Sequence, residues 1–176
     1  MERSRPPRKL DPDGLWEYAL RILAQRANSS AELRQKLSRR ADSPESVTNV
    51  LDKLREYGFS DDSKFSEAFA AARLQNQGFG RMRVMRELRA KRVAGSVAQK
   101  AIEKTFAGTE ERDLARQYLE RRYRGKNLPE FLSDEKQLAA AYRRLRTAGF
   151  GGSTSMDVLR SYSRRARELQ DPPEEE

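Results

Sequence analysis

The apolar residues between Ser60 and Phe106 recur at helical spacing and predict three short helices. The first helix has four apolar residues at positions i, i+3, i+4 and i+7, which places them on one face. The second carries two apolar residues on one side and arginines elsewhere. The residues that mark the three faces are Phe65, Ala68, Phe69 and Ala72, then Val84 and Leu88, and then Val97, Ala98, Ala101 and Ile102.

The same pattern precedes this stretch at a constant offset of 51 residues. The matching apolar pairs are Ala19 and Ala70, Leu23 and Leu74, Leu33 and Val84, Leu37 and Leu88, Val50 and Ala101, and Leu51 and Ile102. These matches need no gap. A period of this length that contains three helical segments is typical of a helical repeat protein.

A third copy follows with an insertion. Leu119 and Leu145 are 26 residues apart, whereas the corresponding leucines of the first two copies are 14 apart, so the third copy holds 12 extra residues. Because one such unit buries too few side chains to be stable alone, neighbouring units must pack. We therefore predict an all-α fold of nine helices in three tandem three-helix repeats that form an elongated, curved array.

The repeats also fix the expected boundaries. We expect a disordered basic and proline-rich arm at 1–13, repeats at 14–59, 60–108 and 109–170, and a disordered acidic tail at 171–176. Helix ends carry recognisable signals: Ser29 with Glu32 forms a capping box, and Gly58 and Gly149 suit the left-handed residue after a helix. Further N-caps are expected at Ser43, Ser60, Thr109, Ser133 and Ser155.

The composition excludes several kinds of chemistry. The chain has no cysteine and no histidine, so it has neither a disulfide, nor a histidine-ligated metal, nor a serine–histidine catalytic pair. Phosphate-binding loop motifs are absent, and we expect no enzyme activity, cofactor or metal. The adjacent acids Asp61 and Asp62 could bind Mg²⁺, but first-turn acids on a helix are the favoured interpretation. The N-terminus lacks the apolar core of a signal peptide, and no segment reaches membrane-spanning length, which predicts a cytoplasmic protein.

The net charge of +9 predicts a partner that carries phosphates or acidic side chains. One basic helix contains a single acid, Glu87, and we expect its basic face to bind that partner. Its residues are Arg81, Arg83, Arg86, Arg89, Lys91 and Arg92. A secondary basic zone comprises Arg121, Arg122, Arg124, Lys126, Arg143, Arg144 and Arg146. For both groups, a merely solvated helix face is the alternative.

Several segments resemble the RecX family of bacterial recombination regulators. They are Ala19–Arg26, Ser30–Leu37, Val50–Asp62, Phe65–Leu74 and Arg86–Lys91, with Tyr142–Leu145 and Gly149–Phe150 in the third repeat. The resemblance covers about 15–165 and is strongest in the first two repeats. In the third repeat, a run of Gly151, Gly152, Ser153 and Thr154 replaces a more helix-like entry.

The resemblance implies a non-enzymatic protein that binds the RecA recombinase filament in homologous recombination and DNA repair. It implies inhibition of ATP hydrolysis and strand exchange and loss of filament stability. We also expect a monomer and weak binding to single- or double-stranded DNA. The family has no catalytic residues to carry over. The alternative is a direct DNA-binding helical protein, such as a transcription regulator, with the helix at 81–92 in a groove.

Overall fold

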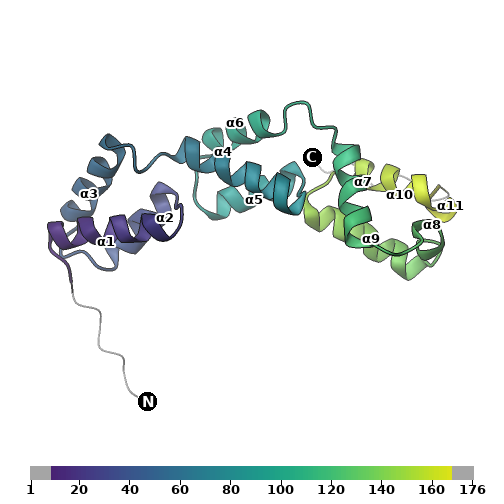
Figure 1. The fold of residues 1–176 in the computed structure, drawn as a ribbon, viewed down its shortest axis with the longest axis horizontal. Helices are drawn as coiled ribbons and strands as arrows, with labels where there is room; N and C mark the ends of the chain where they lie inside the picture. Colours follow the sequence, from purple (N-terminus) through teal and green to yellow (C-terminus); the bar gives the residue numbers. More distant parts are fainter. Residues whose placement is uncertain (1–8, 168–176) are drawn as a thin grey trace, which may run out of the picture. The chain divides into compact units, whose positions relative to one another are not determined.

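The computed structural model describes residues 9–167, and this part of the chain is all-α (Figure 1). Its α-helices are α1 (Pro12–Gln25), α2 (Ser30–Ser38), α3 (Pro44–Glu56), α4 (Asp62–Ala72), α5 (Arg81–Ala90), α6 (Gly95–Thr105), α7 (Glu111–Arg122), α8 (Leu128–Phe131), α9 (Glu135–Ala148), α10 (Gly152–Tyr162) and α11 (Arg164–Arg167). A π-helical turn, η1 (Arg73–Gln77), extends α4. Within the described residues the β-structure is limited to one isolated bridge between Leu10 and Ala41.

The helical repeat predicted from the sequence is confirmed. Helices α2 and α5 begin at Ser30 and Arg81, and α3 and α6 begin at Pro44 and Gly95, so both pairs keep the offset of 51. Helices α7, α9 and α10 supply the third set. Nine helices were expected and eleven α-helices are found in the described part, because α8 lies in the insertion and α11 follows α10.

The leucines expected at matching core positions are buried. Leu37 and Leu88 are fully buried, and Leu51 and Ile102 are each 4% exposed. Leu145 and Leu159 are fully buried in the third repeat. Burying one such side chain contributes about 1.5–3 kcal/mol, so these stripes are the main source of packing energy in each repeat.

The chain divides into two compact units that do not follow the sequence repeats. One contains residues up to Ser66 together with Leu88–Ala98, and the other contains Glu67–Glu87 and the chain from Gln99 onward. In the first unit, α1, α2 and α3 enclose a core built on Leu15, Leu33 and Leu54, each fully buried. In the second, α7, α9 and α10 enclose Leu119, Leu145 and Leu159.

The predicted caps are partly confirmed. Ser29 forms the expected capping box with Glu32, and Ser43 accepts from the amide of Ser46. The expected caps Ser60 and Ser133 are wrong by one residue, because the aspartates that follow them accept the first-turn amides of α4 and α9. An aspartate carboxylate accepts such hydrogen bonds as well as a serine hydroxyl does.

Two further caps were also placed wrongly. The N-cap of α7 is Glu110 rather than Thr109. Helix α10 begins at Gly152, which leaves Ser155 buried inside it. Its start is instead held by α7, since Glu111 accepts from the amide of Gly151 at 3.1 Å. Long-range contacts of this kind leave no signal in the local sequence.

The predicted N-terminal arm is wrong over its last residues. Leu10 exchanges backbone hydrogen bonds with the Arg40–Asp42 segment, and Asp11 caps α1 by accepting from Gly14 at 2.9 Å. These contacts order residues that the sequence assigned to the arm because of their prolines and charges. Residues 1–8 and the predicted acidic tail lie outside the described residues. The three repeat boundaries stay a prediction.

Over residues 9–167, no helix has both the length and the apolar character needed to cross a bilayer.

Candidate binding surfaces

The six basic residues predicted for α5 and its end do not act as one group. Arg81, Arg83 and Arg86 belong to the second compact unit, whereas Arg89, Lys91 and Arg92 belong to the first. Four of the six have intramolecular partners, described below. This division separates residues with a structural role from residues that remain available to a ligand.

Arg83 and Lys91 are held in ion pairs. Arg83 Nε donates to Glu87 at 3.0 Å, and its guanidinium lies 3.6 Å from the centre of the Phe79 ring. Glu87 also accepts from Arg73 Nε at 2.6 Å. Burial disfavours the ionised form of Glu87, but the hydrogen bonds from Arg83 and Arg73 outweigh that effect and hold the pKa of this carboxyl below its usual value.

Lys91 completes a polar cluster in the first unit. Its Nζ donates to Glu32 at 3.1 Å, and its carbonyl accepts from the Ser29 hydroxyl at 2.7 Å. Burial opposes ionisation of Glu32, yet the Ser29 amide, Lys91 and Arg26 together keep its pKa below the usual value. Lys91 therefore joins the end of α5 to the start of α2 and is not available as a binding cation.

Arg81 and Arg86 donate to backbone carbonyls. Arg81 reaches the carbonyl of Phe106 at 2.9 Å, an oxygen beyond the end of α6 that also accepts from the amide of Thr109. Arg86 makes a longer contact of 3.4 Å to the carbonyl of Thr147. Of the six, only Arg89 and Arg92 have exposed side chains that form no ion pair or hydrogen bond with another described residue. They are the part of the predicted face best placed to bind a partner.

The secondary basic zone is more open. Arg121, Arg122, Arg124, Lys126 and Arg143 are exposed. None of them forms an ion pair within the described residues. Arg144 lies 5.6 Å from the centre of the Tyr123 ring, and Arg146 donates to the carbonyl of Phe150 at 3.0 Å. The structure thus keeps five of the seven predicted cations available and uses the other two in packing.

One contact of this zone was not predicted. Arg121 and Arg122, at the end of α7, line a shallow hollow together with Asn76 and Gln77 of η1 and Tyr118. The Oε1 atom of Gln77 is buried and has no hydrogen-bond donor among the described residues. Leaving a buried acceptor without a donor costs about 1–3 kcal/mol. The apolar periodicity carries no signal for η1, because π-helical turns are rare single-turn features within longer helices.

The first unit also carries an aromatic cluster that sequence periodicity did not single out. Tyr57 and Phe59 are 61% and 53% exposed, although aromatic side chains of this size are usually well covered. Trp16 lies 5.9 Å from Tyr57 between ring centres, and the Lys53 ammonium lies 4.5 Å from the Trp16 ring centre. The cluster packs against itself at the end of α3.

The acids Asp61 and Asp62 have structural roles. Asp61 caps α4, and Asp62 Oδ1 accepts from the amide of Ser30 at 2.7 Å. The described residues contain no group of three metal-binding side chains. Asp62 therefore lies in the first turn of α4, as expected, whereas Asp61 precedes that turn as its N-cap.

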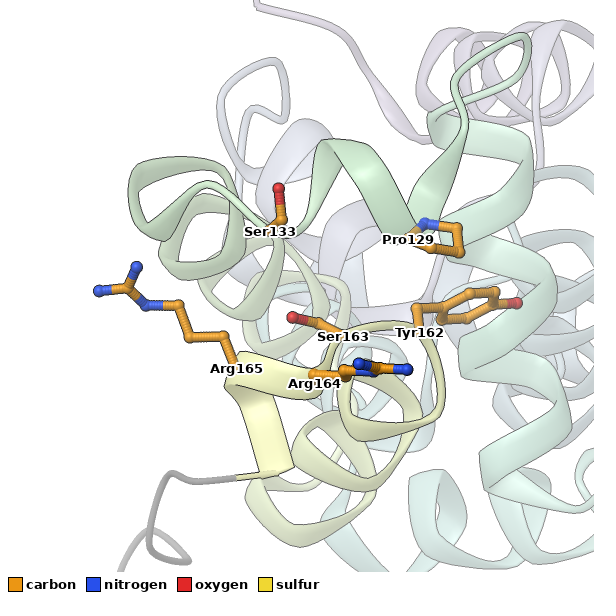
Figure 2. A pocket seen from close by; sticks show the side chains of 6 residues that line it. All are labelled: Pro129, Ser133, Tyr162, Ser163, Arg164 and Arg165. Carbon is orange, nitrogen blue, oxygen red and sulfur yellow. The ribbon is translucent and has the colours of Figure 1, made fainter.

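A larger pocket lies between α8, α10 and α11 (Figure 2). Two of its polar side chains already have partners: Ser163 donates to the carbonyl of Leu132 at 3.0 Å, and Tyr162 donates to Glu120 at 2.6 Å. Burial and the Glu120 carboxylate raise the pKa of Tyr162 to about 12. Figure 2 shows Arg165 directed away from Tyr162 and Arg164, and it pairs with Glu135 at 2.6 Å. Three of the six lining side chains are therefore engaged within the third repeat.

Comparisons with known proteins agree on one family. A model of the first three-helix domain of RecX matches residues 16–54, and a model of the second matches residues 61–102. The chain is 32% identical to the regulatory protein RecX of Deinococcus radiodurans over 160 residues, which cover 90% of this chain and 74% of that protein. It is 35% identical to the regulatory protein RecX of Mycobacterium sp. strain JLS over 143 residues, covering 81% and 78%.

A solved structure supports the same fold. The crystal structure of a regulatory protein RecX matches with a TM-score of 0.68 at 22% identity, covering 85% of this chain and 73% of the other. At this identity the match supports the fold alone.

Proposed function

Because this chain belongs to the RecX family, we propose that it binds the RecA filament on single-stranded DNA and lowers its ATPase activity, strand exchange and stability. The observation that carries the proposal is family membership. The set of exposed cations without acidic partners supports it, because a nucleoprotein filament offers phosphates and acidic side chains.

The direct test is a titration of the cognate RecA filament. We expect the DNA-dependent ATPase rate to fall at or below an equimolar ratio, with the protein sedimenting together with the filament. An ATPase rate that stays constant or rises over the whole titration, despite co-sedimentation, would contradict inhibition and leave a stabilising role.

The contribution of the α5 end is tested by charge reversal. Arg81 is a poor choice, because its substitution also removes the hydrogen bond to Phe106. We expect Arg89→Glu with Arg92→Glu to weaken filament binding, since both side chains are exposed and make no ion pair within the described residues. Arg21→Glu with Arg34→Glu is the matched control: both are exposed and the change in net charge is the same. Equal weakening by both pairs would mean that net charge alone acts.

The contacts of α5 disfavour the alternative of a DNA-reading helix. A recognition helix needs several side chains free to reach base edges. Four of the six basic residues of this segment are held by Glu87, Glu32 or backbone carbonyls. A strong sequence preference for duplex DNA, measured without RecA, would restore this alternative.

A further inference from the structure

The hollow between η1 and the end of α7 combines three kinds of group that few surface sites bring together. It has a volume of about 280 Å³ and lies wholly within the second compact unit. Its lining contains two amides, one phenol ring and two guanidinium groups. These residues are Asn76, Gln77, Tyr118, Arg121 and Arg122. The volume lies just below the usual range for sites of drug-sized ligands, which suits one small planar ring.

The two arginines give this hollow an uncompensated positive charge. Arg121 and Arg122 form no ion pair within residues 9–167, and the nearest acid in sequence, Glu120, accepts from Tyr162. The Arg121 guanidinium lies next to the backbone of Gly78: a methyl group added at that glycine would overlap its Nη2 atom. Gly78 itself has a left-handed φ of 64°. A guanidinium without a carboxylate partner is a ready phosphate ligand.

Tyr118 provides a fixed aromatic surface beside these cations. Its ring lies 6.5 Å from Phe79 and 5.7 Å from Phe150 between ring centres, tilted by 51° and 58°. The two tilted neighbours hold the ring in place from within the protein. A half-buried aromatic ring of this kind is the usual platform on which an unpaired base stacks.

The π-helical turn brings polar amides to the same hollow. Its wide turn ends where the amide of Gly78 donates to the carbonyls of Arg73 and Leu74. Gln77 has an Oε1 atom without a donor, and a half-turn of its amide group exchanges the oxygen and nitrogen positions. Every nucleobase carries at least one N–H group that can donate a hydrogen bond to such an amide oxygen. π-Helical turns also occur frequently at functional sites.

We propose that this hollow binds one unpaired nucleotide of single-stranded DNA. The base stacks on Tyr118 and meets the amides of Asn76 and Gln77, and the adjoining phosphates bind Arg121 and Arg122. An acidic protein segment would use the two arginines but would leave the ring and the amides without a role. Duplex DNA does not fit, because its bases are stacked and cannot enter a hollow. The proposal concerns DNA alone and holds independently of RecA.

The test measures the anisotropy of a short labelled oligothymidylate without RecA. We expect Arg121→Gln with Arg122→Gln to weaken binding about tenfold at moderate salt, with a shallower salt dependence, because two phosphate contacts are lost. The matched control is Arg34→Gln with Arg112→Gln, which removes the same charge from exposed positions outside the hollow and outside both predicted basic groups. Equal weakening by the two pairs would overturn the site and leave attraction by net charge.

Two further arms examine the base and the chemical class of the ligand. Wild-type protein should bind an abasic oligonucleotide of equal length several-fold more weakly, and Tyr118→Phe should bind like the wild type because it keeps the ring. Equal affinity for the abasic strand would overturn base binding. Polyglutamate that competes as well as oligothymidylate would assign the arginines to an acidic protein instead. Because RecA is absent from every arm, failure here leaves the filament titration unaffected.

Discussion

The carboxylate of Glu87 shows how single residues decide what a basic helix can do. It accepts from Arg73 and Arg83, and both arginines also lie against phenylalanine rings. A count of basic residues in α5 therefore overstates the charge available to a partner. The same is true of Lys91, which is paired with Glu32.

This ion-pair arrangement predicts an acid-sensitive contribution to stability. The pKa of folded Glu87 is below its unfolded value, so the contribution is present above the unfolded pKa of about 4.3 and is lost as the pH falls through the folded pKa. Glu87→Gln should lower the melting temperature at pH 7. The melting temperature of this variant should then fall less than that of the wild type when the pH is lowered. Glu56→Gln, at an exposed position on α3, should follow the wild type. Parallel pH profiles for Glu87→Gln and wild type would contradict this role.

Two left-handed glycines provide a matched pair for a packing test. Gly58 has a φ of 73° and open space where a Cβ would lie, whereas at Gly149, with a φ of 94°, a Cβ would overlap the backbone of Arg83. Gly58→Ala should cost about 1–2 kcal/mol from backbone strain alone. Gly149→Ala should cost clearly more, because the first turn of α5 must also move. Equal losses in chemical denaturation would show that this contact is loose.

At the scale of elements, periodicity located the helices better than it located their ends. The apolar stripe of α2 and the capping box at Ser29 were both readable, because each signal lies within a few residues. The start of α10 was not readable from the sequence, since it is held by a hydrogen bond from the Gly151 amide to Glu111 of α7. The hollow beside η1 was also hidden: Asn76 and Gln77 meet Arg121 only through the tertiary fold. Arg121 and Arg122 themselves were predicted, from charge alone.

The N-cap of α2 should contribute more to the free energy of unfolding than the N-cap of α3. Ser29 accepts from Glu32 and also donates to the carbonyl of Lys91, whereas Ser43 caps α3 within its own segment. Ser43→Ala should cost about 1 kcal/mol, and Ser29→Ala should exceed it because it also removes the hydrogen bond that the fully buried Ser29 donates to the carbonyl of Lys91. Chemical denaturation of both variants measures the difference. A smaller loss for Ser29→Ala would contradict the link to α5.

Helix α5 offers a second comparison within one element. Leu88 is fully buried and Met82 is 48% exposed. Leu88→Ala should cost about 2–5 kcal/mol, and Met82→Ala should stay within about 0.5 kcal/mol. A melting temperature left unchanged by Leu88→Ala would mean that the repeat register is wrong at this position.

At the scale of the whole molecule, the all-α repeat could be predicted because it depends on a pattern that the chain repeats. The division into compact units could not, because it depends on which helices meet in space. Helices α4, α5 and α6 each have residues in both units. Net charge was readable from the sequence, but the fraction of it held in internal ion pairs was not.

The net charge of +9 leads to a prediction for the filament complex. If cations make the main contacts, binding measured by co-sedimentation should weaken steadily as salt rises, because each contact is screened or releases counterions. Binding that does not respond to salt would instead indicate apolar docking. The cluster of Trp16 with the exposed Tyr57 and Phe59 would then be the first surface to substitute.

The hydrogen bond between Ser29 and Lys91 has a consequence for how such a chain can change over evolutionary time. A duplicated three-helix module is readily copied, but here the first copy is completed by a residue that the second copy encodes. Exchange of the first module between related genes would separate Glu32 from its lysine unless the donor carried a compatible residue 59 positions later. Recombination breakpoints between the modules should therefore yield poorly folded chimaeras, and substitutions at Glu32 and Lys91 should be inherited together.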